Sequence, residues 1–173
     1  VDLKESCLRS ETTVKVFDQM RKLQSYTDEG SPGRDWNVAT GMVIEGKAGF
    51  QIMGDWAKGE FTAAGKVPGV DYYCAATPSN NGYLYNVDSF IFYKSSDPDK
   101  QAGQKLLAKL MMGKNFQKVF NLYKGSIPAR LDVSMDEFDK CAKTSNADIK
   151  TAGASGGLVP SFAHGMAQGN TMK

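Results

Sequence analysis

Residues 42–56, with the sequence MVIEGKAGFQIMGDW, constrain the fold of this chain more than any other stretch. Their apolar side chains are interrupted by Gly46, Gly49 and Gly54, positions at which a backbone can bend or be approached closely. We therefore expect the end of a helix, then a short buried strand and a tight turn that presents Trp56. The indole of Trp56 has a flat apolar face and one N–H donor, which suits a ligand with C–H and O–H groups; packing in a core is the alternative.

Composition excludes several classes of protein. With 173 residues, the chain can form one ordinary domain or be a piece of something larger. Its formal charge of +2 comes without a cluster of basic residues, so we expect no nucleic-acid partner. No run approaches the roughly 18 apolar residues of a membrane-spanning helix. The glycines match neither glycine-rich phosphate-binding motif, and we expect no cofactor.

The cysteines allow one disulfide and one free thiol. Cys7, Cys74 and Cys141 lie far apart and show none of the spacing of a zinc or redox motif, so we expect no metal site. Spacing alone does not choose the pair. As a working hypothesis we pair Cys74 with Cys141 and leave Cys7 free, with the other pairings still open.

Hydrophobic periodicity and turn signals predict a mixture of helices and strands, and hence an α/β or α+β fold. Apolar residues at three- and four-residue spacing predict helices over residues 11–26, 37–45, 57–64, 97–112, 115–123, 135–143 and 147–152. We expect Ser134 to cap the helix over 135–143. Aromatic and β-branched runs predict strands over residues 72–77 and 83–93, and the glycine-rich segment 153–157 is expected to be flexible.

Three polar side chains are candidates for ligand contacts. Asp88 interrupts the predicted strand over 83–93, so its carboxylate either binds a ligand or accepts hydrogen bonds from a local turn. Lys124 ends a predicted helix, where it either stabilises the helix dipole or reaches into a cleft. His164, the only histidine, is either structural or functional. No nucleophile motif and no pair of carboxylates stands out to indicate an enzyme.

Four blocks in order carry a family resemblance: GMVIEGKAGFQIMGDW, NVDSFIFYK, FQKVFNLYKGSIPAR and GGLVPSFAHGMA. They resemble the extracytoplasmic sugar-binding proteins that feed ABC transporters, most closely the bacterial periplasmic glucose/mannose-binding branch. The resemblance covers nearly the whole chain. It implies an α/β, two-lobed fold of the periplasmic-binding-protein type (type II), with the ligand in a cleft between the lobes.

The resemblance also implies how the chain is divided between the lobes. Residues 1–85 belong to the C-terminal lobe, residues 86–130 cross the hinge into part of the N-terminal lobe, and residues 131–173 return. The first part of the N-terminal lobe and the closing helices of the family have no counterpart in this sequence. We therefore expect a C-terminal fragment of a protein roughly twice as long.

By the same resemblance, Trp56, Asp88, Lys124 and His164 face the sugar, with Trp36 and Asn86 as further candidates. The indole of Trp56 would stack on the C–H face of a pyranose, Asp88 would accept from two hydroxyls, and Lys124 and His164 would donate to ring or hydroxyl oxygens. The family also supports a Cys74–Cys141 disulfide, formed in an oxidising periplasm.

The implied function is periplasmic binding of a monosaccharide, with glucose expected, and delivery to the membrane permease of an ABC transporter without chemical turnover. One alternative is a carbohydrate-active enzyme with a similar aromatic cleft, which would need a close pair of catalytic carboxylates. The other is an inactive fragment that merely associates with its missing N-terminal half.

Overall fold

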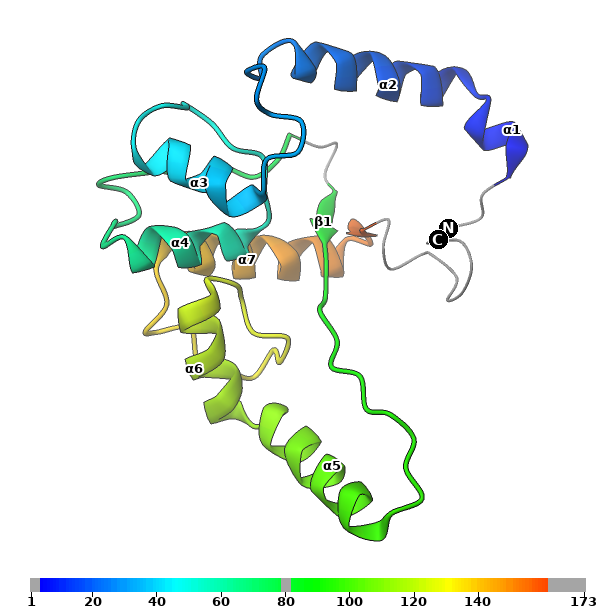
Figure 1. Cartoon of the computed structure of the whole chain (residues 1–173), viewed down its shortest axis with the longest axis vertical. Coiled ribbons are helices and arrows are strands. Elements are labelled where there is room, and N and C mark those ends of the chain that lie inside the picture. Colours follow the sequence, from blue (N-terminus) through cyan, green and yellow to red (C-terminus); the bar gives the residue numbers. More distant parts are fainter. Residues whose placement is uncertain (1–3, 79–81, 162–173) are drawn as a thin grey trace.

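The computed structural model describes residues 4–78 and 82–161 of the chain (Figure 1). Helices dominate these residues and strands are short. The elements in chain order are α1 (Glu5–Leu8), α2 (Glu11–Gln24), α3 (Trp36–Ile44), the 3-10 helix η1 (Asp55–Ala57), α4 (Lys58–Ala63), β1 (Tyr83–Tyr85), α5 (Pro98–Met111), α6 (Lys114–Lys124), α7 (Lys140–Ala154) and β2 (Leu158–Pro160).

Side-chain caps and glycines explain where the principal helices begin and end. The Ser10 hydroxyl accepts from the Thr13 amide at the start of α2, and the Asp139 carboxylate accepts from the Ala142 amide at the start of α7. Gly125, with a φ of 87°, ends α6 in the left-handed conformation that glycine adopts without strain. The predicted helices over 11–26, 37–45, 97–112 and 115–123 are confirmed as α2, α3, α5 and α6.

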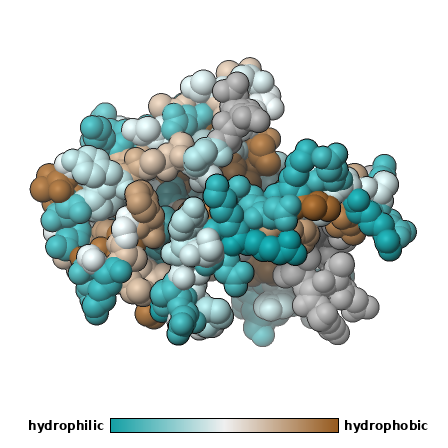
Figure 2. Space-filling model, turned by 90° about the horizontal axis from the view of Figure 1, so that it is seen from above, coloured by the Kyte–Doolittle hydropathy of each residue, from teal (hydrophilic) through white to brown (hydrophobic). Residues whose placement is uncertain are grey.

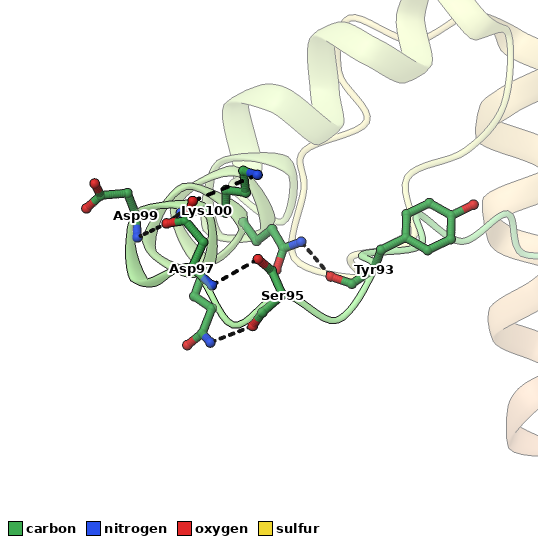
Figure 3. A network of polar contacts seen from close by, with 7 residues as sticks. Tyr93, Ser95, Asp97, Asp99 and Lys100 are labelled. Atoms are coloured by element: carbon green, nitrogen blue, oxygen red, sulfur yellow. Dashed lines mark hydrogen bonds and ion pairs between the residues drawn. The ribbon is translucent and has the colours of Figure 1, made fainter.

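The start of α5 shows how local polar contacts fix a helix to the segment before it (Figure 3). The Asp97 carboxylate accepts from the amides of Asp99 and Lys100, and the Asp97 amide itself donates to the Ser95 hydroxyl at 3.2 Å. Side-chain amides of α5 reach back to the Ser95 and Tyr93 carbonyls. The extended segment before α5 is therefore tied to the helix through its carbonyl oxygens.

The two strands form one parallel pair. Tyr83 lies opposite Leu158, Leu84 opposite Val159 and Tyr85 opposite Pro160, with the strands separated in sequence by α5, α6 and α7. Because parallel strands point the same way, the residues that follow β1 and those that follow β2 meet at the same edge. This places Asn86 beside Ser161.

Three strand predictions are wrong in whole or in part. The expected strand over 83–93 is limited to β1, no strand forms over 72–77, and residues 47–54 contain none of the expected buried strand. Phe50 and Ile52, expected in the core, are 95% and 69% exposed. Apolar alternation produces a strand only where a second strand is available to pair with it, and among the described residues β1 pairs only with β2.

The helix predictions after residue 134 also need correction. Ser134 caps no helix, because its hydroxyl accepts from the Asp136 amide at 3.2 Å within a local turn. The helices predicted over 135–143 and 147–152 are replaced by the single helix α7, which Asp139 caps. Segment 153–157, expected to be flexible, is partly helical, and its Gly157 amide donates to the Ala152 carbonyl at 2.8 Å.

The core lies between α6, the segment that follows it and the start of α7, and α4 packs against α6 (Figure 1). Val133, Phe138 and Ala142 form the centre of the core, and the rings of Phe61 and Tyr72 form a second apolar contact, stacked with their centroids 4.1 Å apart. A disulfide between Cys74 and Cys141 ties the segment after Tyr72 to α7, as predicted, and Cys7 is free and exposed.

Large apolar surfaces remain outside this core. The apolar face of α2 is exposed over Val16, Phe17, Met20 and Leu23, and apolar side chains reach the surface beside hydrophilic ones in Figure 2. The accessible surface is 13,399 Å², whereas a folded monomer of this length exposes roughly 8,300 Å². Within the described residues, no helix is long and apolar enough to cross a membrane.

Loss of the disulfide should destabilise the fold. Because Cys74 and Cys141 are 67 residues apart, replacing both by serine should lower the free energy of unfolding by up to about 4 kcal/mol in urea titrations. Cys7→Ser, at the free and exposed cysteine, is the control and should change it by less than about 0.5 kcal/mol. Equal midpoints for all three proteins would contradict a structural role for the bridge.

Candidate functional site

A cleft of about 410 Å³ lies between the ends of several elements. This volume is within the range of small-molecule sites, roughly 300–1,000 Å³. The side chains and glycine that line it come from the start of α3, from η1 and α4, from the segment after β1 and from the end of α6: Trp36, Trp56, Gly59, Glu60, Asn86, Asp88, Tyr123 and Lys124.

Two glycines bring α4 and the end of α6 into backbone contact (Figure 1). A methyl group on Gly59 would lie 2.9 Å from the Lys124 carbonyl oxygen, and one on Gly125 would lie 2.5 Å from the Gly59 nitrogen. Both distances are too short for a side-chain carbon, so only glycine fits at either position. Nearby, the Asp55 carboxylate accepts from the Ile127 amide at 3.1 Å. This contact sets η1, which carries Trp56, beside the end of α6, which carries Lys124.

A buried ion pair holds α4 from its other side. Lys58 is only 7% exposed at its side chain, and its ammonium lies 2.8 Å from the Asp139 carboxylate. Asp139 also caps α7, so one carboxylate joins the start of α4 to the start of α7. Burial, and then the charge of Asp139, raise the pKa of the neighbouring Tyr72 to about 12. Tyr72 therefore stays neutral. Through Lys58 and Gly59, α4 is anchored to the start of α7 and to the end of α6.

The charged side of the cleft is an ion pair between Lys124 and Asp88. Asp88 is 65% exposed and Lys124 28% exposed at their side chains, and the Asn86 side-chain amide donates to the same carboxylate at 3.2 Å. Lys124 is the last residue of α6, where its charge also stabilises the negative end of the helix dipole. Lys124 therefore lies both at the helix end and in the lining of the cleft, and Asp88 has a partner 36 residues away as well as a local one.

The aromatic side of the cleft is fixed by backbone contacts. The Trp36 carbonyl accepts from the Thr40 hydroxyl at 3.0 Å and from the side-chain amide of Gln51 at 2.9 Å, which ties the loop after α3 to the start of that helix. Trp56 is half-buried, and its ring packs against Gly54, where a methyl group would clash with the ring. Trp56 therefore contacts its own chain at Gly54 and also lines the cleft.

The sequence-predicted site residues thus meet in one place, with one exception. Trp36, Trp56, Asn86, Asp88 and Lys124 line the same cleft, and His164 lies outside the described residues. The cleft also contains three residues that we did not predict as site residues, Gly59, Glu60 and Tyr123. Helical spacing could have indicated Glu60, since it stands four residues after Trp56 in continuous helical backbone.

The arrangement suits a polyhydroxylated ligand more than a metal ion. Within residues 4–78 and 82–161, no three His, Cys, Asp or Glu side chains gather closely enough to hold a metal. The cleft instead combines flat apolar rings with a carboxylate, an ammonium and a side-chain amide, which are acceptors and donors for hydroxyl groups.

Comparison with known proteins identifies the family. The family model described as bacterial extracellular solute-binding protein matches residues 1–151, so the chain belongs to that family, which implies a periplasmic-binding-protein-like fold. A probable sugar-binding periplasmic protein of Brucella suis is 47% identical over 174 residues, covering 100% of this chain and 41% of the relative.

Two further relatives extend the comparison. A probable sugar-binding periplasmic protein of Mesorhizobium japonicum is 48% identical over 165 residues, covering 95% of this chain and 39% of the relative. An uncharacterized ABC transporter extracellular-binding protein of Pyrococcus horikoshii is 33% identical over 157 residues, covering 90% of this chain and 34% of the relative. The chain spans about two fifths of the length of the Brucella and Mesorhizobium relatives.

The contact between α4 and α6 can be tested with a matched pair of glycines. Gly65→Ala changes a residue with a φ of 69° and open space around it, and should lower the free energy of unfolding by about 1–2 kcal/mol. Gly125→Ala adds a clash with the Gly59 backbone to the same strain, and should lower it by about 1–3 kcal/mol more. If the two variants lose the same free energy of unfolding in urea titrations, the close approach of Gly125 to Gly59 does not contribute to stability.

Proposed function

We propose that this chain contributes part of the binding cleft of an extracytoplasmic, periplasmic sugar-binding protein of an ABC transporter. The ligand is a monosaccharide, with glucose expected from the glucose/mannose-binding branch that the sequence resembles. One observation carries the proposal: a single cleft brings two tryptophans together with the Asp88–Lys124 ion pair. The relatives in Brucella and Mesorhizobium, named as probable sugar-binding periplasmic proteins, support a sugar ligand, and the Pyrococcus relative, named as an ABC transporter extracellular-binding protein, supports an ABC transporter.

The chemistry of the cleft matches that of a pyranose. A sugar ring has apolar C–H faces that stack on Trp56 or Trp36, and an edge of hydroxyls that donate to Asp88 and accept from Lys124 and Asn86. Once the cleft has closed over the sugar, a wrong epimer would leave one of these groups without its hydrogen bond, which is the basis of selectivity. His164 is a further donor in this proposal.

Binding and release, without chemical turnover, complete the proposed mechanism. Residues 1–85 and 131–173 form parts of one lobe and residues 86–130 cross to the other, and the lobes close on the sugar before docking on the permease. The Cys74–Cys141 disulfide is of the kind that persists in an oxidising compartment such as the periplasm.

The exposed apolar surfaces support the proposal that the chain is a fragment of a longer protein. The curated relatives are more than twice as long as the part matched here. We expect their additional residues to have counterparts that cover the apolar face of α2 and pair with the extended segment 89–93, whose apolar side chains are exposed. By itself, the fragment would then bind sugar weakly or not at all.

A carbohydrate-active enzyme is the second candidate, because two carboxylates, Glu60 and Asp88, line the same cleft. A glycosidase needs such a pair, one member as acid and the other as base or nucleophile. Release of sugar from a panel of glycosides would favour this candidate, whereas saturable binding without turnover favours the transport protein.

Asp88→Ala tests the proposed site. In the full-length protein, this change should weaken glucose binding about fivefold or more in calorimetric titrations, since a hydrogen bond to a charged group contributes more than about 1 kcal/mol. Asp18→Ala is the matched control, because Asp18 is also an exposed, ion-paired aspartate but lies on α2, outside the cleft. Unchanged affinity in Asp88→Ala would remove Asp88 from the site.

A further inference from the structure

The edge where β1 and β2 end carries a chain of polar contacts that leads into the cleft. The Ser161 amide donates to the Tyr85 carbonyl at 2.8 Å, which continues the parallel pairing one residue beyond β2. The backbone therefore fixes Ser161 next to Asn86, although the two residues are 75 positions apart in the sequence.

From this position the Ser161 hydroxyl donates to the Asn86 side-chain carbonyl oxygen at 2.9 Å. The amide nitrogen of the same Asn86 side chain donates to the Asp88 carboxylate at 3.2 Å, and the other Asp88 oxygen pairs with Lys124. Donors and acceptors alternate along this chain. If the Asn86 amide were rotated by half a turn, its oxygen would face the Asp88 carboxylate and two acceptors would meet.

We propose that Ser161 is a positioning residue of the cleft, which orients the Asn86 amide and through it holds the Asp88 carboxylate against Lys124. The proposal deepens the proposed function and rests on it for the ligand. Ser161 itself is not among the residues that line the cleft, so its effect on binding is exerted through Asn86.

Ser161 matters because it adds a tie between β2 and the segment that carries Asp88. Residues 86–93 form no strand in the part of the chain that the structure describes, and the Asp88 side chain is largely exposed. The hydrogen bond between Asn86 and Asp88 spans only two residues and moves with the segment. The hydroxyl of Ser161 ties this segment to β2, so less conformational freedom is lost when a sugar binds.

Ser161→Ala and Ser161→Thr form a matched pair, because threonine keeps the hydroxyl and alanine removes it. In the full-length protein, alanine should weaken glucose binding about two- to tenfold in calorimetric titrations, the effect of one hydrogen bond, and threonine should restore affinity to within about twofold. Both variants should keep the thermal midpoint of the parent. Parent-like affinity in Ser161→Ala would overturn the proposal while leaving the sugar site in place.

A double-mutant cycle separates positioning from direct contact. In an Asp88→Ala background, Ser161→Ala should cause a smaller loss than it causes in the parent, since the carboxylate that Ser161 positions is gone and only its effect on Asn86 remains. A full additional loss would show that Ser161 acts by another route, and would overturn the proposal.

A measurement without ligand tests the role of Ser161 even if the protein does not bind glucose. The side-chain amide resonance of Asn86 in nitrogen–proton NMR spectra should move in Ser161→Ala and stay in place in Ser161→Thr. If the Asn86 resonance does not move in Ser161→Ala, the proposed role of Ser161 is overturned, whichever ligand the protein binds. Absence of glucose binding by the parent counts against the proposed function instead, and the Asn86 resonance then decides whether Ser161 positions the carboxylate.

Discussion

The backbone contact between Gly59 and Gly125 is the constraint on which the rest of the site depends. A side chain at either position would push α4 away from the end of α6, because the free space is smaller than one methyl group. With both glycines present, Trp56 and Lys124 lie on one surface, although they are far apart in the sequence. The Lys58–Asp139 ion pair and the Cys74–Cys141 disulfide then fix this surface to α7.

The cleft is formed by two groups of elements, η1 with α4 and α6 on one side and the segment after β1 on the other, and they differ in the contacts that hold them. The side formed by η1, α4 and α6 rests on the core and on backbone contacts, so its aromatic and cationic groups are already in place. The side that carries Asn86 and Asp88 follows a three-residue strand, and its contacts include hydrogen bonds between side chains and the ion pair with Lys124. Because side-chain contacts rearrange more readily than backbone contacts, we expect ligand binding to order this side more than the other.

How much could be predicted from the sequence depended on whether local or distant residues decide the structure. Helix α5 is fixed by its own periodicity and by Asp97 at its start, and it was predicted nearly to the residue. The strand over 83–93 failed beyond Tyr85 because pairing depends on a second strand, which no local pattern reveals. Trp56, Asp88 and Lys124 were candidates from their local sequence, and the family resemblance favoured the ligand role over the structural one. Tyr123 and Ser161, in contrast, are placed by contacts between distant segments.

Fluorine NMR of protein labelled with 5-fluorotryptophan tests most directly whether this cleft binds the sugar, because Trp36 and Trp56 line it from different elements. Trp36→Phe and Trp56→Phe variants assign the two resonances. Our account predicts that both resonances of the full-length protein shift saturably with glucose, at the same midpoint as in calorimetry. If calorimetry shows that glucose binds while both tryptophan resonances stay in place, the sugar binds elsewhere and the account is contradicted.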